Sequence, residues 1–434
     1  MVKIQTICRV TEEMTRETPS DVYKVHRNLD PTLHPLQQAR EYKRALNAAK
    51  LEKIFSKPFV SALSEHTDSI FSLSRSDRDL SLLLSSSANG EVKLWDLCKM
   101  KCIESHQAHS GAVSGVSFRQ GYKVSSGHDS VVTLWRENGK LDKYKAESSL
   151  TGIDLSWTEP SFVTSSQDGV SLWDFRRSTP VQQYSCGSDT LTKAKFNPAE
   201  NHLVCAVGND RGVLLIDCRT NTLMEKIKLK VKSNDLAWNP QEPINFTVAN
   251  EDGNLYSFDM RKMTEALKIH KDHLNSVTSV SYNPNGREFV SGSFDKTVRI
   301  FDVREGRSRE VYHTRRMQWV YAVEFSGDGK FVLTGSDDTN IRVWKARAHV
   351  PVKVMLPKEQ EAMWYREKLK RKFKHVPEIR RLLKHRHLPR YLYSMKREKH
   401  IMSQSKFRKE KNVQAHTKAE KLKIEPEKKK VVVE

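Results

Sequence analysis

The sequence predicts an all-β fold made of seven repeated units, with helical segments before and after it. Seven short β-like runs close on an aromatic or aliphatic residue, at Trp95, Trp135, Trp173, Ile216, Phe258, Phe301 and Trp344. The spacings between these positions are 40, 38, 43, 42, 43 and 43 residues. Such a period is too long for a coiled coil or a leucine-rich repeat, and it fits a unit of four strands.

The interior of each unit repeats as well. A carboxylate usually stands six residues before the closing position, at Asp129, Asp210, Asp252, Asp295 and Asp338. Unit one has Asn89 there, and unit three has Asp168 five residues before Trp173. Residues 291–302 and 335–344 follow this order most fully, as a strand, a tight turn that carries the Asp, and a second strand. Residues 58–347 therefore resemble the WD40 family, which implies a seven-bladed β-propeller.

This resemblance implies a buried hydrogen-bond network in each blade, formed by a His, a Ser or Thr, the turn Asp and the Trp. His109, Asp129 and Trp135 fill these places in unit two, and His273 and Asp295 fill them in unit six. Unit one offers His66 with Asn89, whereas units three, four, five and seven have no matching His, so we expect their networks to be incomplete.

A Ser, His and Asp in one network have the composition of a catalytic triad. Buried polar groups must be paired in every blade, whereas catalysis needs one such group in one pocket. We therefore interpret these residues as structural and predict no catalytic residue; the protein is expected not to be an enzyme.

The strand Phe59–Leu63 predicts how the ring closes. It precedes His66 as the outermost strand of one blade precedes the next unit, yet no unit stands before it. After Trp344 the chain becomes polar, without an obvious fourth strand. We expect Phe59–Leu63 to complete the last blade, which leaves no open edge.

The net charge of +21 is concentrated at the C-terminal end. Residues 345–434 contain 28 Lys and Arg against 10 Asp and Glu, whereas residues 1–344 contain 46 against 43. An excess of basic residues that is confined to one segment indicates the kind of partner that the segment binds and gives no information on the fold. We therefore divide the chain into an N-terminal extension (1–57), the propeller (58–347), a basic helical tail (348–403) and a disordered basic tail (404–434).

Two helices are predicted in the basic tail and one in the N-terminal extension. Residues 357–375 have acidic residues in the first turn and basic residues at the end, and Pro377 begins a second short helix. Residues 36–55 carry apolar residues at a helical period, and we expect this helix to dock on a partner or on a blade. Beyond about residue 404 the apolar residues become rare, which predicts disorder.

Basic residues interleaved with aromatic ones favour nucleic-acid binding, because Lys and Arg neutralise phosphates while rings stack on bases. The candidate RNA-binding residues are Lys368, Lys370, Arg371, Lys372, Lys374, Arg380, Arg381, Lys384, Arg386 and Arg390. By composition alone, a nuclear-localisation signal explains these residues equally well, and the two functions are compatible.

The tail carries a second resemblance. The strings LPKEQE at 356–361, LKRKF at 369–373, HVPEI at 375–379 and RHLPRYLY at 386–393, together with Tyr365, resemble the C-terminal extension of the suppressor-of-fibrillarin WD40 proteins. The strings RNLDP at 27–31 and HPL at 34–36 are similar to the lead-in of the same family. This resemblance implies a scaffold of the nucleus and nucleolus that works in pre-18S rRNA processing within the small-subunit processome, with pre-rRNA and snoRNP proteins as partners.

Four successive units end in Asp-x-Arg, which indicates a different function. The arginines are Arg176, Arg219, Arg261 and Arg304. In some WD40 proteins an Arg at this place helps the propeller dock on the adaptor of a cullin-RING ubiquitin ligase, so the resemblance implies a substrate receptor as the alternative. A solvated Arg is the ordinary interpretation of such a short pattern.

The cysteines and the hydropathy of the sequence argue against several further classes of site and partner. Six cysteines without a C-x-x-C pair, and no secretory leader after Met1, indicate reduced intracellular thiols. Cys98, Cys102, His106 and His109 have a nonstandard spacing for zinc, so we predict no metal and no cofactor. No apolar run is long enough to span a membrane, and neither a membrane nor a small-molecule substrate is expected as a partner.

Overall fold

The computed structural model describes residues 34–135, 141–185, 187, 189–220, 222–417 and 426–433. Within them the chain forms two compact units. The first contains the described part of Met1–Lys57 together with Arg347–Arg386, and the second contains Pro58–Ala346 with the described part of His387–Glu434. The predicted boundary at 347–348 therefore lies next to a real division, whereas the tail itself is divided near residue 386 between the two units.

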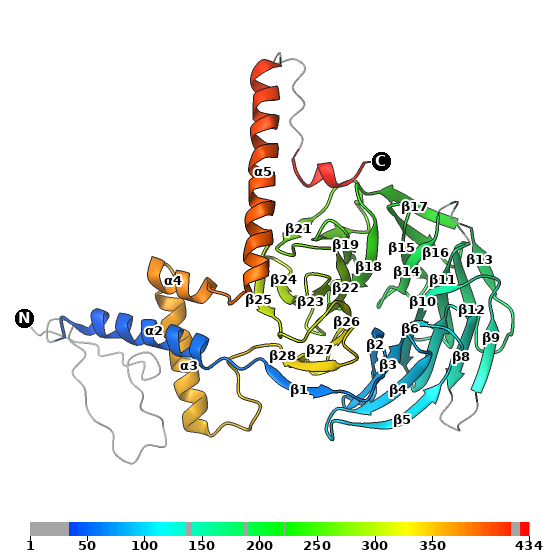
Figure 1. Ribbon diagram of the computed structural model, residues 1–434, viewed down its shortest axis with the longest axis horizontal. Coiled ribbons are helices and arrows are strands. Elements are labelled where there is room, and N and C mark those ends of the chain that lie inside the picture. Colours follow the sequence, from blue (N-terminus) through cyan, green and yellow to red (C-terminus); the bar gives the residue numbers. More distant parts are fainter. Residues whose placement is uncertain are drawn as a thin grey trace, which may run out of the picture. The chain divides into compact units, whose positions relative to one another are not determined.

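The second unit contains the predicted seven-bladed propeller (Figure 1). Each blade is a four-stranded antiparallel meander of neighbouring strands. Blades one to three consist of β2 (Ile70–Arg75), β3 (Leu82–Ser87), β4 (Glu91–Asp96) and β5 (Lys101–Gln107), then β6 (Val113–Arg119), β7 (Tyr122–Gly127), β8 (Val131–Trp135) and β9 (Leu141–Lys145), then β10 (Leu150–Leu155), β11 (Ser161–Ser166), β12 (Val170–Asp174) and β13 (Gln182–Tyr184). Their first three strands are the most buried, because both faces of these strands are covered by adjacent blades.

Blades four to seven continue the same order. They consist of β14 (Leu191–Phe196), β15 (Leu203–Gly208), β16 (Gly212–Asp217) and β17 (Thr222–Lys228), then β18 (Ser233–Trp238), β19 (Asn245–Asn250), β20 (Asn254–Asp259) and β21 (Lys268–Lys271), then β22 (Val277–Tyr282), β23 (Glu288–Ser293), β24 (Val298–Asp302) and β25 (Ser308–Tyr312), and finally β26 (Val320–Phe325), β27 (Phe331–Ser336), β28 (Ile341–Lys345) and β1 (Phe59–Leu63). The predicted closure is confirmed, because β1 pairs with β28 as the fourth strand of blade seven (Figure 1).

The repeated Asp forms the turn between the second and third strands of a blade. Asp295 accepts hydrogen bonds at Oδ1 from the backbone N–H and the hydroxyl of Thr297, two residues further on. Lys296 between them adopts a left-handed φ of 60°. In blade five Gly253 has the corresponding role with a φ of 81°. A carboxylate that accepts from the backbone two residues on is the mechanism by which Asp favours such turns.

Strand direction decides which turns share a face of the ring. Neighbouring strands of a meander run in opposite directions, so in every blade the turns after the first and third strands lie on one face. The turns after the second strand and the connections to the next blade lie on the opposite face. We call these the Asp-x-Arg face and the network face, because the Asp-x-Arg patterns follow third strands and the turn Asp residues follow second strands.

Among the described residues, the first unit contains three helices, α2 (Gln37–Ile54), α3 (Pro357–Lys372) and α4 (Pro377–Lys384). All three agree closely with the predicted segments. The partner of α2 differs from the prediction, because in this unit it packs against α3 and α4. Ala45 and Ala49 of α2 share a buried cluster with Leu369 of α3 and Ile379 of α4. Two alanines on one face of a helix let neighbouring helices approach closely.

The prediction of disorder from residue 404 is wrong for the part of this tail that the structure describes. Helix α5 (Arg390–His416) continues through residue 404. It contains neither Gly nor Pro and is rich in Lys, Arg, Gln and Met, which are good helix formers. Scarcity of apolar residues therefore indicated a solvated helix in this segment and not a disordered chain.

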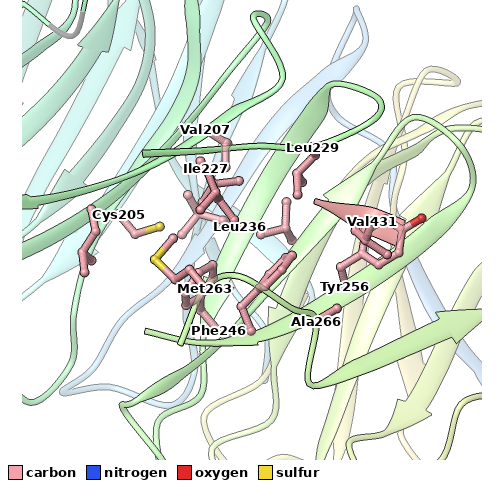
Figure 2. Close-up of a cluster of buried hydrophobic side chains, with 14 of the residues drawn as sticks. Cys205, Val207, Ile227, Leu229, Leu236, Phe246, Tyr256, Met263, Ala266 and Val431 are labelled. Carbon is pink, nitrogen blue, oxygen red and sulfur yellow. The ribbon is translucent and has the colours of Figure 1, made fainter. Parts of the chain in front are cut away.

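The last described residues, 426–433, also depart from the prediction, because they pack on the propeller. Val431 is buried in a cluster with Leu229, Tyr256 and Ala266 from blades four and five, as Figure 2 shows. The backbone N–H of Lys230 donates to Val431 O at 3.2 Å, and that of Val433 donates to Lys228 O at 2.8 Å. The end of the chain is thus attached to the outer edge of blade four through one apolar side chain and a short antiparallel pairing.

Candidate functional site

The His273 network of blade six is fully buried. His273 Nδ1 lies 2.9 Å from Asp295 Oδ2, and its Nε2 lies 2.7 Å from the Ser291 hydroxyl. Burial lowers the pKa of His273, against the pull of the Asp295 carboxylate. Burial would raise the pKa of Asp295, but His273, Arg299 and Thr297 outweigh it and hold that pKa well below its usual range. At neutral pH a neutral imidazole therefore donates from Nδ1 to an ionised carboxylate.

Blade two repeats this arrangement, but its carboxylate is less buried than that of blade six. His109 Nδ1 lies 3.0 Å from Asp129 Oδ1, and His109 Nε2 lies 2.6 Å from the Ser125 hydroxyl. Trp135 is buried in the same blade, with the His106 ring stacked at 6.4 Å. Burial lowers the pKa of His109, so this imidazole is also neutral at pH 7. Each network links strands of a single blade, which is a structural arrangement.

Blade one differs from what the sequence predicts, and blade five contains a buried His that the repeat pattern does not predict. In blade one, His66 Nε2 bonds the Ser85 hydroxyl at 2.7 Å, while the Asn89 amide donates to Thr67 and not to His66. In blade five His270 is buried and bonds a hydroxyl of the third strand, a contact that sequence reasoning missed. Its Nε2 lies 3.1 Å from the Ser257 hydroxyl, and its Nδ1 lies 2.8 Å from Glu305 O. His270 stands in the fourth strand instead of before the first, so the repeat pattern contained no signal for it.

The central channel holds charged side chains in pairs. Arg119 lies 3.2 Å from Asp154, and Lys195 lies 3.5 Å from Asp235. These groups line a cavity of about 190 Å³ at the axis of the ring. Burial lowers the pKa of Lys193, whose ammonium donates to Ser114 O across the channel. The channel is thus lined by ion pairs between adjacent blades and crossed by a hydrogen bond from blade four to blade two.

The four Asp-x-Arg arginines are all exposed on one face of the propeller. In each pattern the Asp carboxylate accepts the backbone N–H of the Arg, at 3.1 Å for Arg176 and at 2.9 Å for Arg219, Arg261 and Arg304. This bond fixes the turn after the third strand, so the arginine side chain begins from a defined point. Four such turns in neighbouring blades form a row of cationic groups along the Asp-x-Arg face.

Two of these arginines also bond their own Asp through the side chain. The Arg261 guanidinium contacts Asp259 at 3.2 Å and 3.0 Å, and that of Arg219 contacts Asp217 at 3.5 Å and 3.4 Å. The hydrogen bonds from Arg261 lower the pKa of Asp259. The side chains of Arg219 and Arg261 remain 66% and 67% exposed, so each is oriented yet accessible to a partner.

The first unit, which we call the helical unit, has an apolar interior and a basic exterior. Tyr365, Leu369 and Phe373 lie at a helical period on α3 and face the shared core, as Ile379, Leu382 and Leu383 do on α4. The basic residues between them occupy the other side of each helix. Arg371, Lys374, Arg380, Arg381 and Lys384 are exposed, and Arg390 is exposed at the start of α5 in the propeller unit.

Four of the ten candidate RNA-binding residues are only partly accessible or already paired. Lys370 forms an ion pair with Glu52, and Lys372 forms one with Glu41 at 2.8 Å, so both help to hold α2 on α3. Lys368 is half-buried with its ammonium 5.3 Å from the centre of the Trp364 ring, and Arg386 is half-buried as well. The structure therefore divides the predicted set into six exposed cations and four with contacts inside the fold.

Among the residues that the structure describes, no group of three or more His, Cys, Asp or Glu side chains could hold a metal ion. His109 is occupied by Asp129 and Ser125, while Cys98 is exposed on the turn before β5. In the same part of the chain, no helix has the length and apolar character needed to cross a membrane.

Comparison with known proteins supports both resemblances. A Sof1-like domain matches residues 346–432, and the WD domain, G-beta repeat, matches residues 57–96, 264–302 and 310–345. The chain is 43% identical to DDB1- and CUL4-associated factor 13 of Xenopus tropicalis, over 100% of this chain and 99% of that protein. It is 42% identical to the protein of that name from Homo sapiens over the same shares. The identity is 41% with the Dictyostelium discoideum protein, over 95% of each chain.

These relatives are similar to the chain along both its propeller and its basic tail. The seven-bladed ring is a scaffold fold whose buried His, Ser and Asp groups link strands within a blade. The chain therefore belongs to the Sof1-like family of WD40 proteins, which includes the DDB1- and CUL4-associated factor 13 proteins of these organisms.

Proposed function

We propose that this protein is a non-enzymatic scaffold in ribosome biogenesis, which contributes to pre-18S rRNA processing within the small-subunit processome of the nucleolus. The observation that carries the proposal is the two-sided helical unit. Its apolar residues are used in the packing of α2, α3 and α4, and its exposed cations remain for a polyanion. The Sof1-like match over residues 346–432 and the resemblance to suppressor-of-fibrillarin proteins support pre-rRNA and snoRNP proteins as partners.

The proposal is tested by removing exposed charge from the helical unit of the full chain. A variant with Arg371, Arg380, Arg381 and Lys384 replaced by Gln is expected to bind RNA with a salt dependence flatter by about 3 in log-log slope, at about 0.7 per lost single-strand phosphate contact. With an added import signal, it should leave pre-ribosomal particles and fail to support early pre-rRNA cleavage.

The matched control replaces Lys99, Lys101, Lys143 and Lys145 by Gln. These four lysines are exposed at the outer strands of blades one and two, so the same charge is lost elsewhere. The control should sediment with pre-ribosomes as the unmodified chain does. If the helical-unit variant also sediments normally and supports cleavage, the basic tail is only an import signal and the proposal is wrong.

The second candidate function is that of a substrate receptor of a cullin-RING ubiquitin ligase. The row of exposed arginines on the Asp-x-Arg face favours it, and the name of the relatives associates those proteins with DDB1 and CUL4. Replacing Arg176, Arg219, Arg261 and Arg304 by Glu, one at a time, should abolish co-purification of DDB1 at one or two positions and leave pre-rRNA association intact. Arg177→Glu, an exposed neighbour outside the pattern, is the control; retention of DDB1 by all four variants would remove this candidate.

A further inference from the structure

An aromatic row crosses the network face of the propeller between blades six, seven and one. Trp319, in the loop between β25 and β26, is 47% exposed. Its ring lies against Phe294 with centroids 5.4 Å apart, Phe294 contacts Tyr321 at 5.9 Å, and Tyr321 contacts Phe71 at 5.1 Å. Trp319 is also fixed through its backbone, because its carbonyl accepts the N–H of Asp337 at 2.9 Å. An indole supported in this way offers a rigid flat surface to a ligand.

Cationic residues stand in the Trp319 loop and in the neighbouring turn of blade six. Arg315 and Arg316 are exposed in the same loop. The ammonium of Lys296 donates to Gln318 Oε1 at 2.6 Å, which holds it beside Trp319. Asp337, whose backbone N–H donates to Trp319 O, is an exposed residue of the opposite charge.

The start of α5 brings further groups to this surface. The Tyr391 hydroxyl donates to Asp295 O at 2.9 Å, directly before Lys296. The preceding His387 ring lies 5.7 Å from that of His313, at the start of the Trp319 loop. Arg390 is exposed, and the Tyr391 side chain is 42% exposed. We call the set Lys296, Arg315, Arg316, Trp319, Arg390 and Tyr391 the blade-six patch.

We propose that the blade-six patch binds single-stranded RNA, with a base stacked on Trp319 and phosphates contacted by the surrounding cations. Aromatic faces interleaved with Lys and Arg are the requirements of such a site, since rings stack on any base and cations follow the backbone. The patch belongs to the propeller unit, whereas the exposed cations of α3 and α4 belong to the other unit. The identity of the nucleic acid as RNA rests on the proposed function; the stacking site rests on the geometry of blades six and seven.

The experiment uses the full chain and a twelve-residue oligouridine probe, with one 5-iodouridine for photocrosslinking. Crosslinks should map to the tryptic peptide 317–330, which contains Trp319. Trp319→Leu should weaken oligouridine binding about fivefold or more, because stacking on an aromatic side chain is lost. Trp319→Phe keeps a ring and should retain most of the affinity. This pair of variants separates stacking from simple apolar contact.

Charge variants test whether the cations of the blade-six patch contact phosphates. Replacing Arg315 and Arg316 by Gln should lower the log-log salt slope by about 1.4, at about 0.7 for each single-strand phosphate contact. Replacing Arg176 and Arg177 by Gln removes an identical exposed pair from the Asp-x-Arg face and should leave the slope unchanged. Asp337→Asn removes the negative charge of the residue that bonds the Trp319 carbonyl and should strengthen binding of the oligouridine.

Failure of this inference is distinguishable from failure of the proposed function. The variant with four Gln substitutions in α3 and α4 should bind oligouridine more weakly, yet still crosslink through peptide 317–330. The inference is overturned if Trp319→Leu, with an unchanged melting temperature, binds oligouridine as tightly as Trp319→Phe. It is also overturned if Trp319→Leu loses a protein partner from purified particles while oligouridine binding persists, which would assign the patch to protein recognition.

Discussion

Phe59 and Trp344 are Cα partners in blade seven, and their rings meet edge to face with centroids 5.6 Å apart. Phe59 begins the first strand of the propeller, while Trp344 closes its last unit. Further along the same pairing, Leu63 is the partner of Ile341, and both side chains are buried. The first strand of the propeller thus completes its last blade, so neither end of the ring exposes an open edge.

Removing β1 should prevent cooperative folding of the ring. A chain that begins at residue 65 lacks all of β1, whereas one that begins at residue 57 keeps it, together with Pro58, whose carbonyl accepts the Lys345 N–H at 2.8 Å. Both truncated chains lack α2, so they differ at the closure alone. Urea unfolding should be cooperative for the longer chain and broad for the shorter one. Identical unfolding curves would show that closure by β1 contributes nothing to stability.

Asp295→Ala should destabilise the propeller by about 1 to 3 kcal/mol, because it leaves buried donors without an acceptor. The donors are His273 Nδ1, the Leu274 N–H, and the hydroxyl and N–H of Thr297. Asp168→Ala is the control, since Asp168 is exposed and its blade has no corresponding His. Thermal unfolding measures both. A loss in the control equal to that in Asp295→Ala would mean that the turn and not the network matters.

Lowering the pH should destabilise the folded protein, because its buried histidines are neutral in the folded state and become protonated in the unfolded chain. Burial lowers the pKa of both His66 and His270 from 6.5 to about 4. Between pH 4 and 6.5 the unfolded chain therefore binds more protons than the folded one, so stability falls as the pH falls through this window. The loss is on the order of 3 kcal/mol for each histidine at most, since one pKa unit corresponds to about 1.4 kcal/mol.

The variant His270→Gln tests this pH dependence directly. Its unfolding free energy, measured in urea from pH 7.5 to 4.5, should vary less steeply than that of the unmodified chain. His106→Gln is the matched control, because His106 is exposed on β5. Equal pH dependence for His270→Gln and the unmodified chain would contradict a neutral buried His270.

Val431→Asp should release the end of the chain from blades four and five. A carboxylate is costly in the apolar cluster around Leu229 and Tyr256, and the segment can avoid this cost by detaching. Hydrogen exchange at the amides of Lys230 and Val433 should then accelerate, because both donate within the pairing that Val431 anchors. Val433→Asp is the control, since Val433 is exposed. Unchanged exchange in the Val431 variant would argue against this attachment.

The parts of the fold that the sequence predicts correctly depend on local, repeated patterns. The spacing from Trp95 to Trp344 indicates seven four-stranded units, because each unit must place the same residue types at the same points of one meander. The bounds of α2, α3 and α4 were predicted to within a few residues, from Pro at the helix starts and apolar residues at a helical period. Closure through Phe59–Leu63 was predicted by counting strands.

The candidate sites were predicted less completely. The four Asp-x-Arg arginines are recognisable because each stands at a fixed place in a repeat. The accessibility of the basic residues in the tail cannot be recognised from the sequence. Lys370 and Arg371 are adjacent basic residues, yet Lys370 pairs with Glu52 while Arg371 is exposed. That difference depends on which side of α3 meets α2, and hence on a residue more than 300 positions away.

The sequence by itself determines the number of blades, the strand that closes the ring, the turns formed by Asp, and the concentration of positive charge in the tail, because these follow from residue types at short and regular separations. The tertiary structure alone decides that α2 packs on α3 and α4, that His270 fills the buried position of blade five, that Val431 lies in the core between blades four and five, and that Trp319 has cations from two distant segments beside it. Each of these depends on contacts between residues far apart in the chain, whose partners are chosen by shape and burial once the blades have formed.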